Sequence, residues 1–182
     1  MAKARIFLSG VEPKVSLGRF AGTDDTLKLM RDYALGAEGE KNIVVRQMTE
    51  RIIAHVAPKD YLSEILAIRA WCTGPHLRYT NDQRHVELVK TPYRIVSEIL
   101  SSGVSLVDCD DTATLIATMG MQIGREASFA VVGFGSPGRY THVFARLREP
   151  KTGQWIVCDP VAGPNESRML KQVKTFKVVS VD

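Results

Sequence analysis

The character of the chain changes near Gly124. Before this point, apolar residues recur at helical spacing, with Asp, Asn or Thr near helix starts and Gly near helix ends. After it, short apolar or alternating runs follow one another, separated by turns that contain Gly and Pro. Helices first and hairpin-connected strands afterwards are typical of an α+β fold, not of a doubly wound parallel sheet. We therefore expect an α+β chain that ends in an antiparallel sheet.

The expected elements can be placed along the chain. Helices are expected at residues 23–36, 42–55, 58–73, 91–101 and 108–120, and strands at 127–134, 142–148, 154–158 and 173–181. Residues 3–20 carry short β-like pieces that indicate a small hairpin or an arm. Because the composition shifts in the polar segment 36–42, we divide the chain into an N-terminal arm or small extension, residues 1–40, and a main domain, residues 41–182.

Length and composition exclude several classes of protein. A chain of 182 residues with 45% apolar residues fits one globular domain with an appendage. No apolar run approaches the roughly 20 residues that span a bilayer, so we expect no membrane partner. The apolar stretch at residues 6–8 is too short for the roughly 7–15 residues of a signal-peptide core. We therefore expect a cytoplasmic protein.

Charges and cysteines narrow the choice further. The formal net charge is +4, but basic and acidic residues are interspersed and no helix-turn-helix, zinc or stacking-aromatic signature accompanies them. Nucleic acid is therefore not an expected partner. The three cysteines lack the spacing of a disulfide framework or a zinc site. Two of them, Cys72 and Cys158, are expected to be partly buried and inert.

The third cysteine, Cys109, stands where a loop enters a helix. Free N–H groups and the helix dipole at such a position stabilise a thiolate, so a cysteine there tends to have a lowered pKa. Asp110 and Asp111 oppose this effect if their carboxylates lie close to the sulfur. A small buried hydrophobic residue is the alternative interpretation of Cys109.

Two downstream residues supply the partners that a nucleophilic cysteine needs. His142 begins one expected strand and Asp159 follows the next, and the turn at residues 150–153 joins the two strands as a hairpin. Adjacent antiparallel strands can therefore bring the two side chains together. Cys109, His142 and Asp159 would then act as nucleophile, general base and orienting carboxylate. Taken singly, His142 could be a surface strand residue and Asp159 a turn former before Pro160.

The segment from Val107 to Pro160 resembles the transglutaminase-like cysteine hydrolase superfamily. The matching motifs are Asp108-Cys109-Asp110-Asp111 with Ala113, then Thr141-His142-Val143-Phe144, then Trp155-Ile156-Val157-Cys158-Asp159-Pro160. Upstream, the helix that ends at Trp71, the Arg78-Tyr79 pair and Thr91-Pro92 are also similar, so the resemblance covers roughly residues 60–164. Two positions depart from the family pattern: Val107 replaces a glycine, and Val-Phe follows His142 where Ala-Trp is common.

The resemblance implies a papain-like core, in which the cysteine helix packs on an antiparallel sheet that carries His142 and Asp159. It implies acyl transfer through a thioester on an amide bond of a protein or peptide substrate, with no metal or other cofactor. The Cys109 N–H would stabilise the oxyanion, with Tyr79 or Trp71 as a second donor. Because the chain is small, we expect hydrolysis, as in a cysteine protease or amidase, ahead of transglutaminase-like cross-linking.

Three alternatives use the same residues or their neighbours. A non-catalytic transglutaminase-like scaffold would bind an assembly partner through residues 1–40. A Mg²⁺-dependent aspartyl phosphatase would use residues 108–112 as a DxDxT motif, but it needs a parallel sheet and a second acidic cluster, for which the remaining 70 residues give no sign. Residues 133–138 match GxGxxG, yet Pro137 and the following strand favour a hairpin turn over a dinucleotide site. His55, His76 and His85 have no motif partners.

Overall fold

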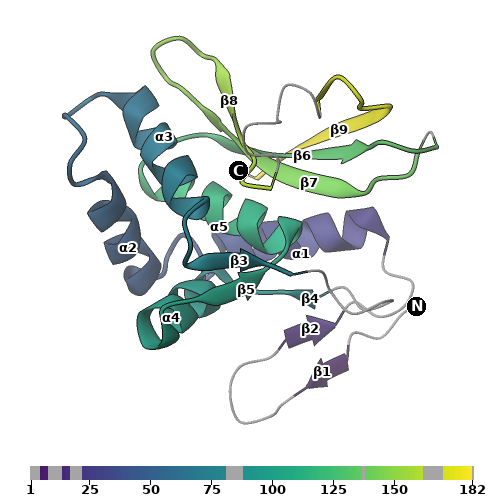
Figure 1. Cartoon of the computed structure of the whole chain (residues 1–182), viewed down its shortest axis with the longest axis horizontal. Coiled ribbons are helices and arrows are strands. Elements are labelled where there is room, and N and C mark those ends of the chain that lie inside the picture. The colour runs from purple at the N-terminus through teal and green to yellow at the C-terminus, as the bar shows by residue number, and fades with distance from the viewer. Residues whose placement is uncertain are drawn as a thin grey trace.

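The computed structural model describes residues 22–80, 88–136, 138–161 and 170–181, together with the backbone of residues 5–7 and 14–16. Helices cover one face of a four-stranded antiparallel sheet, and α5 (Cys109–Gln122) packs directly against its strands β6 and β7 (Figure 1). The α+β class predicted from the sequence is therefore correct. The boundary at residue 40 and the papain-like type of fold stay predictions.

The large sheet lies close to where the sequence predicts it. Its strands have the order β8-β7-β6-β9, and every neighbouring pair is antiparallel. The strands are β6 (Ala127–Gly133), β7 (His142–Arg148), β8 (Trp155–Cys158) and β9 (Thr175–Ser180). The GxGxxG segment connects β6 to β7 and opens no helix, as the hairpin interpretation requires.

The five helices also follow the predicted order. Besides α5 they are α1 (Thr23–Leu35), α2 (Ile43–Ile53), α3 (Tyr61–Cys72) and α4 (Pro92–Ser102). Asn42 and Thr91, which precede α2 and α4, accept hydrogen bonds from backbone N–H groups of the first turn. One start was predicted wrongly: α3 begins after Asp60, whose carboxylate accepts the Ser63 N–H, instead of at Pro58. Helix α1 begins at Thr23 as predicted, with Gly22 as a cap that makes no side-chain bond.

The main core lies between α5 and the sheet. Phe129 and Val131 of β6 and Ala145 and Leu147 of β7 alternate onto this face and are nearly or fully buried. Helix α5 approaches β7 closely because it presents Gly120 there: a Cβ at this position would come within 2.3 Å of a Leu147 methyl carbon. The core thus fixes the position of α5, and with it Cys109, against β7.

The N-terminal residues join the same body. Strands β1 (Arg5–Phe7) and β2 (Lys14–Ser16) form the expected hairpin, and β2 also pairs with β4 (Leu88–Val89). Helix α1 packs on α5 and contributes Leu27, Met30 and Ala34 to the main core. The polar segment after α1 is bound to α5, because the Gln122 side-chain amide donates to the carbonyl groups of three residues. These are Gly39, Glu40 and Asn42.

One pair of strands was missing from the sequence prediction. Strands β3 (Leu77–Tyr79) and β5 (Ser105–Val107) pair in parallel, and β5 leads directly into the start of α5. Each has only three residues, too few for alternation to be recognised. Their pairing sets Tyr79 beside Val107, two residues before Cys109.

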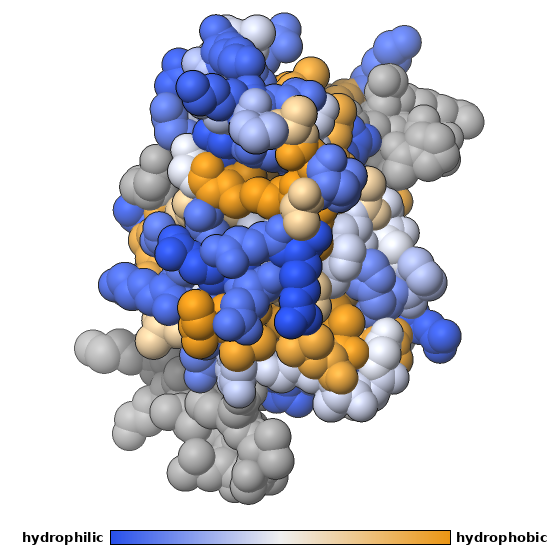
Figure 2. All heavy atoms as spheres, turned by 90° about the vertical axis from the view of Figure 1, so that its left-hand side faces the viewer, coloured by the Kyte–Doolittle hydropathy of each residue, from blue (hydrophilic) through white to orange (hydrophobic). Residues whose placement is uncertain are grey.

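Helices α2, α3 and α4 form the face shown in Figure 2, where hydrophilic residues are interleaved with bands of hydrophobic ones. Exposed apolar side chains on these helices are Ile43, Leu62, Leu66 and Leu100. Among the described residues, no helix combines the length and apolar character that crossing a bilayer requires.

Candidate active site

Cys109 is the first residue of α5, as the sequence predicts. The Asp108 carboxylate accepts the Asp111 N–H at 3.2 Å, and the Asp111 carboxylate accepts the Asp108 N–H at 3.4 Å. This reciprocal capping box fixes the turn that carries the cysteine. Asp111 also accepts the Lys90 backbone N–H at 2.6 Å, which anchors the turn to the strand region before α4.

His142 and Asp159 are in direct contact. His142 opens β7 and Asp159 follows the last residue of β8, and their Nε2 and Oδ2 atoms are 2.7 Å apart. An ionised carboxylate can only accept, so we assign Nε2 as the donor. The side chains are 10% and 1% exposed, so this hydrogen bond is shielded from water. The second Asp159 oxygen accepts the Val161 N–H at 3.0 Å, which orients the carboxylate. The predicted adjacency of these two residues is confirmed.

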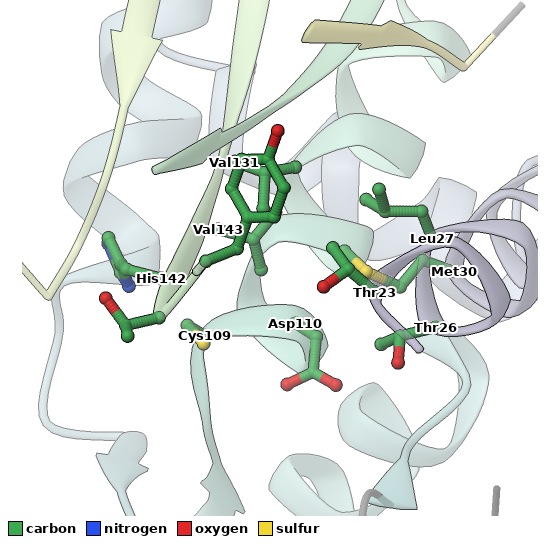
Figure 3. Close-up of a pocket in the computed structure, with 11 residues that line it drawn as sticks. Thr23, Thr26, Leu27, Met30, Cys109, Asp110, Val131, His142 and Val143 are labelled. Carbon is green, nitrogen blue, oxygen red and sulfur yellow. The ribbon is translucent and has the colours of Figure 1, made fainter. Parts of the chain in front are cut away.

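Cys109 and His142 line one pocket of about 180 Å³ (Figure 3). Between these two side chains, however, the structure contains no hydrogen bond. The Cys109 sulfur instead accepts the backbone N–H of Val143, the residue after His142. Val143 has no partner in β8, because the pairing of β7 with β8 ends at Ala145 and Cys158. The thiol therefore lies at the edge of β7 next to the backbone of the histidine.

The environment of Cys109 keeps its thiol protonated. Burial is the largest cause, the Asp110 carboxyl adds to it, and together they raise the pKa of Cys109 to about 12. The Val143 N–H and the Cys109 N–H act in the opposite direction and are outweighed. The pKa of Cys109 is therefore not lowered, as a helix start would favour, but raised, and the neighbouring carboxyls contribute to the rise.

The acidic turn itself is deeply buried. Asp108, Asp110 and Asp111 are 7%, 4% and 4% exposed, and no Lys or Arg side chain among the described residues forms an ion pair with them. Burial, followed by the closeness of Asp108, raises the pKa of Asp110 well above its usual value and that of Asp111 to about 7. At neutral pH the turn therefore carries less negative charge than its sequence suggests.

Tyr79 is the better placed of the two aromatic candidates. Tyr79 is 51% exposed, yet its partial burial, and then the nearby Cys109, Asp108, Asp110 and Asp159, raise the pKa of Tyr79 to about 12. Its O–H is therefore present as a donor at neutral pH, within electrostatic range of the thiol. Trp71 stacks on the His76 ring instead, with ring centroids 4.1 Å apart.

The other titratable candidates behave as expected or lie elsewhere. Cys72 and Cys158 are more buried than predicted, at 2% and 0% exposure, and burial raises the pKa of the Cys72 thiol. His55 lines a separate groove at the end of α2, and His85 lies outside the described residues. In the described part of the chain, no three His, Cys, Asp or Glu side chains are grouped so that they could hold a metal ion.

Sequence reasoning missed one wall of the pocket. Helix α1 faces the turn at residues 108–111, which we call the nucleophile turn, across the cavity (Figure 3). Its lining residues there are Thr23, Thr26, Leu27 and Met30. Their helical spacing predicted a buried face. What that face packs against depends on tertiary contacts with a segment 80 residues away, for which the local sequence gives no signal.

Comparison with known proteins finds no family model that matches the chain, no curated protein that resembles it in sequence and no solved structure that matches its fold. The transglutaminase-like resemblance therefore rests on the sequence motifs alone.

Proposed function

We propose that the chain is a thiol-dependent acyl-transfer enzyme of the transglutaminase-like, papain-like type, acting on amide bonds of protein or peptide substrates through Cys109, His142 and Asp159. The observation that carries this proposal is the shielded 2.7 Å contact between His142 and Asp159, beside a cysteine that opens a buried helix and lines the same pocket. Three free thiols also fit the reducing cytoplasm expected from the sequence.

His142 would act as the general base. Its Nε2 is occupied by Asp159, which leaves Nδ1 on the other side of the ring for the thiol. As the Cys109 sulfur bonds to the substrate carbonyl carbon, its proton moves to Nδ1 and the carbonyl π-electrons move to oxygen. Because the resting thiol is protonated, proton transfer accompanies attack, and no thiolate–imidazolium pair forms beforehand.

The tetrahedral intermediate would be stabilised by hydrogen bonds to its oxyanion. The Cys109 backbone N–H is one donor, and the Tyr79 hydroxyl is proposed as the second because of its closeness to the thiol. When the C–N bond breaks, the imidazolium returns its proton to the leaving amine and the acyl group remains on sulfur as a thioester. Water activated by His142 then attacks the thioester and releases the acid. An amine in place of water would give transglutaminase-like cross-linking.

The decisive experiment is detection of the thioester. The full chain is mixed with a panel of peptide amides, and intact-protein and peptide mass spectrometry follow acylation of Cys109 together with release of the amine. We expect a mass increase at Cys109 that disappears in Cys109→Ser. Cys72→Ala serves as the matched control, because it removes a buried thiol outside the pocket and should leave acylation intact.

The same assay separates the alternatives. Activity that survives EDTA argues against the Mg²⁺-dependent phosphatase, which is also disfavoured because the large sheet is antiparallel. Absence of acylation with every peptide amide, in a folded protein, would overturn the proposal.

A second candidate function is the non-catalytic scaffold, and two observations favour it. No hydrogen bond joins Cys109 to His142, and the thiol pKa lies far above neutrality. In a scaffold, Cys109 would be a packing residue, and Cys109→Ser would not change partner binding. Thioester formation in the assay above excludes this candidate.

A further inference from the structure

One carboxyl oxygen in the pocket, Oδ2 of Asp110, takes part neither in the described hydrogen bonds of the fold nor in the proposed triad. Asp110 is 4% exposed and supplies the only carboxyl group among the described residues that line the pocket. Its Oδ2 atom has no hydrogen-bond partner in the part of the chain that the structure describes. Buried polar atoms of native proteins are nearly always paired, so this vacancy requires a physical explanation.

The neighbouring carboxylate shows that the vacancy is not a general property of the turn. Asp111, equally buried, accepts Lys90 N–H with one oxygen and Asp108 N–H with the other. Both of its oxygens are used by the fold, and it does not line the pocket. Asp110 therefore differs from Asp111 in two respects that matter for ligand binding. It lines the cavity, and its Oδ2 has no hydrogen-bond partner among the described residues.

The position of Asp110 matches a substrate-binding role. Figure 3 shows Asp110 next to Cys109 at the start of α5, on the side that faces Thr26 of α1. The cavity of about 180 Å³ is smaller than the roughly 300–1,000 Å³ of sites for drug-sized ligands, so it suits one side chain or a short piece of backbone. Apolar side chains of Leu27, Met30 and Val131 complete the walls. A group bound there would lie next to the carbonyl that Cys109 attacks.

The chemistry of the occupant follows from the surroundings of Asp110. Burial and the adjacent Asp108 raise the pKa of Asp110 well above its usual value, which favours the uncharged form of its carboxyl. Oδ2 is the Asp110 oxygen that is buried without a hydrogen-bond partner among the described residues, so it can accept a hydrogen bond from a ligand. The cavity combines polar and apolar side chains, and none of its described lining residues is a Lys or Arg. A hydrogen-bond acceptor on such a wall is complementary to an N–H or O–H donor of the ligand.

We propose that Asp110 is a specificity-determining residue whose Oδ2 accepts a hydrogen bond from an uncharged N–H or O–H on the acyl portion of the substrate, within the cavity between α1 and the nucleophile turn. This inference rests on the proposed acyl-transfer function and adds the recognition chemistry of its substrate. Substrates that lack the donor would leave Oδ2 unpaired and would be discriminated against on binding.

The test compares matched substrates in matched variants. Peptide amides that are acylating substrates are paired with analogues whose N–H or O–H next to the scissile carbonyl is methylated, and KM and kcat are measured for each. In the wild type, methylation should raise KM about tenfold, the size of one hydrogen bond to an uncharged group, with a smaller effect on kcat. In Asp110→Ala the same methylation should change KM by less than about twofold.

Two further variants make the outcome specific. Asp110→Asn retains a neutral acceptor of the same shape and should keep the wild-type discrimination. Cys72→Ala, which removes a buried thiol outside the pocket, should keep it too. Equal discrimination in wild type and Asp110→Ala overturns the inference while acyl transfer stands. A wild type that never acylates Cys109 overturns the proposed function, and the inference with it.

Discussion

The two halves of the candidate site are organised to different degrees. His142 and Asp159 are joined by a 2.7 Å hydrogen bond, are largely shielded from water and are held by adjacent strands of one sheet. Cys109 stands on an equally well-fixed helix start, but burial and Asp110 disfavour its thiolate. The base is ready for use in the resting protein and the nucleophile is not. A position at a helix start therefore does not by itself activate a cysteine.

Removal of the nucleophile or of the general base should cause the largest losses of activity. Cys109→Ala leaves no nucleophile and His142→Ala leaves no base for a protonated thiol, so each should lower kcat/KM for a peptide amide by about 10⁴- to 10⁶-fold. Circular dichroism and thermal unfolding check that both variants remain folded. If His142→Ala retained more than about a tenth of the activity, a preformed thiolate would carry the reaction and the comparison would be wrong.

The orienting role of Asp159 can be resolved by two substitutions. Asp159→Ala removes the acceptor of Nε2–H and should cost about 10²- to 10⁴-fold in kcat. Asp159→Asn has one amide oxygen for the two N–H groups, of His142 and Val161, that the carboxylate accepts; with that oxygen facing Nε2, its loss should be smaller than that of Asp159→Ala. Steady-state kinetics of both variants measure the difference. Equal losses would show that the charge of Asp159, more than its orienting bond, supports His142.

The protonated state of Cys109 can be measured directly. Only the thiolate reacts with iodoacetamide, and a thiol with a pKa of about 12 should react at pH 7 at least about tenfold more slowly than a free cysteine. The rate should rise steadily with pH up to pH 9.5. Asp110→Asn removes a negative charge beside the sulfur at high pH and should shift this rise toward lower pH. Alkylation is located by peptide mass spectrometry. A fast, pH-independent rate at pH 6 would contradict a protonated resting thiol.

The acidic turn should also leave a signature in stability. The pKa of Asp111 is raised from 3.8 to about 7 in the folded chain, so the folded state retains a proton that the unfolded state loses. Its contribution to stability is complete below pH 3.8 and is lost as the pH rises through about 7. The Glu98 pKa of about 2 acts with the opposite sign, but only below its ordinary value of 4.5. Wild-type unfolding free energy should therefore fall between pH 5 and pH 8.

Urea titrations at several pH values measure this slope, and Asp111→Asn, which cannot titrate, should flatten it. A wild-type free energy that rises over the same interval, with an unchanged slope in the variant, would contradict the raised pKa.

Much of this arrangement could be predicted from residues with strong local signals. Thr91, Asn42 and Asp108 cap helices, and the apolar runs after Gly124 form strands, because caps and alternation act over a few neighbouring residues. The contact of His142 with Asp159 was predictable because the short turn after β7, with Gly153 at φ +72°, permits only neighbouring strands.

The rest depends on balances and on distant contacts. The pKa of Cys109 depends on the balance between stabilisation of the thiolate at a helix start and the opposing effect of burial. The depth of burial cannot be derived from the local sequence. The parallel pairing of β3 with β5 joins segments 28 residues apart in register, Leu77 with Ser105, by too few residues to leave a pattern. The packing of α1 beside Cys109, which forms one wall of the pocket, depends on contacts between distant segments and could not be predicted from local sequence patterns.

That wall has a consequence for how the protein could change over time. Met30 and Leu27 face the cavity and also belong to the central hydrophobic cluster, whereas Thr23 and Thr26 sit at its partly open rim. Substitutions of Met30 or Leu27 that change substrate selectivity should also lower the stability of the fold, because the same side chains form part of the core. New substrate preferences, whether arising in nature or in directed evolution, should therefore be found first at the two threonines.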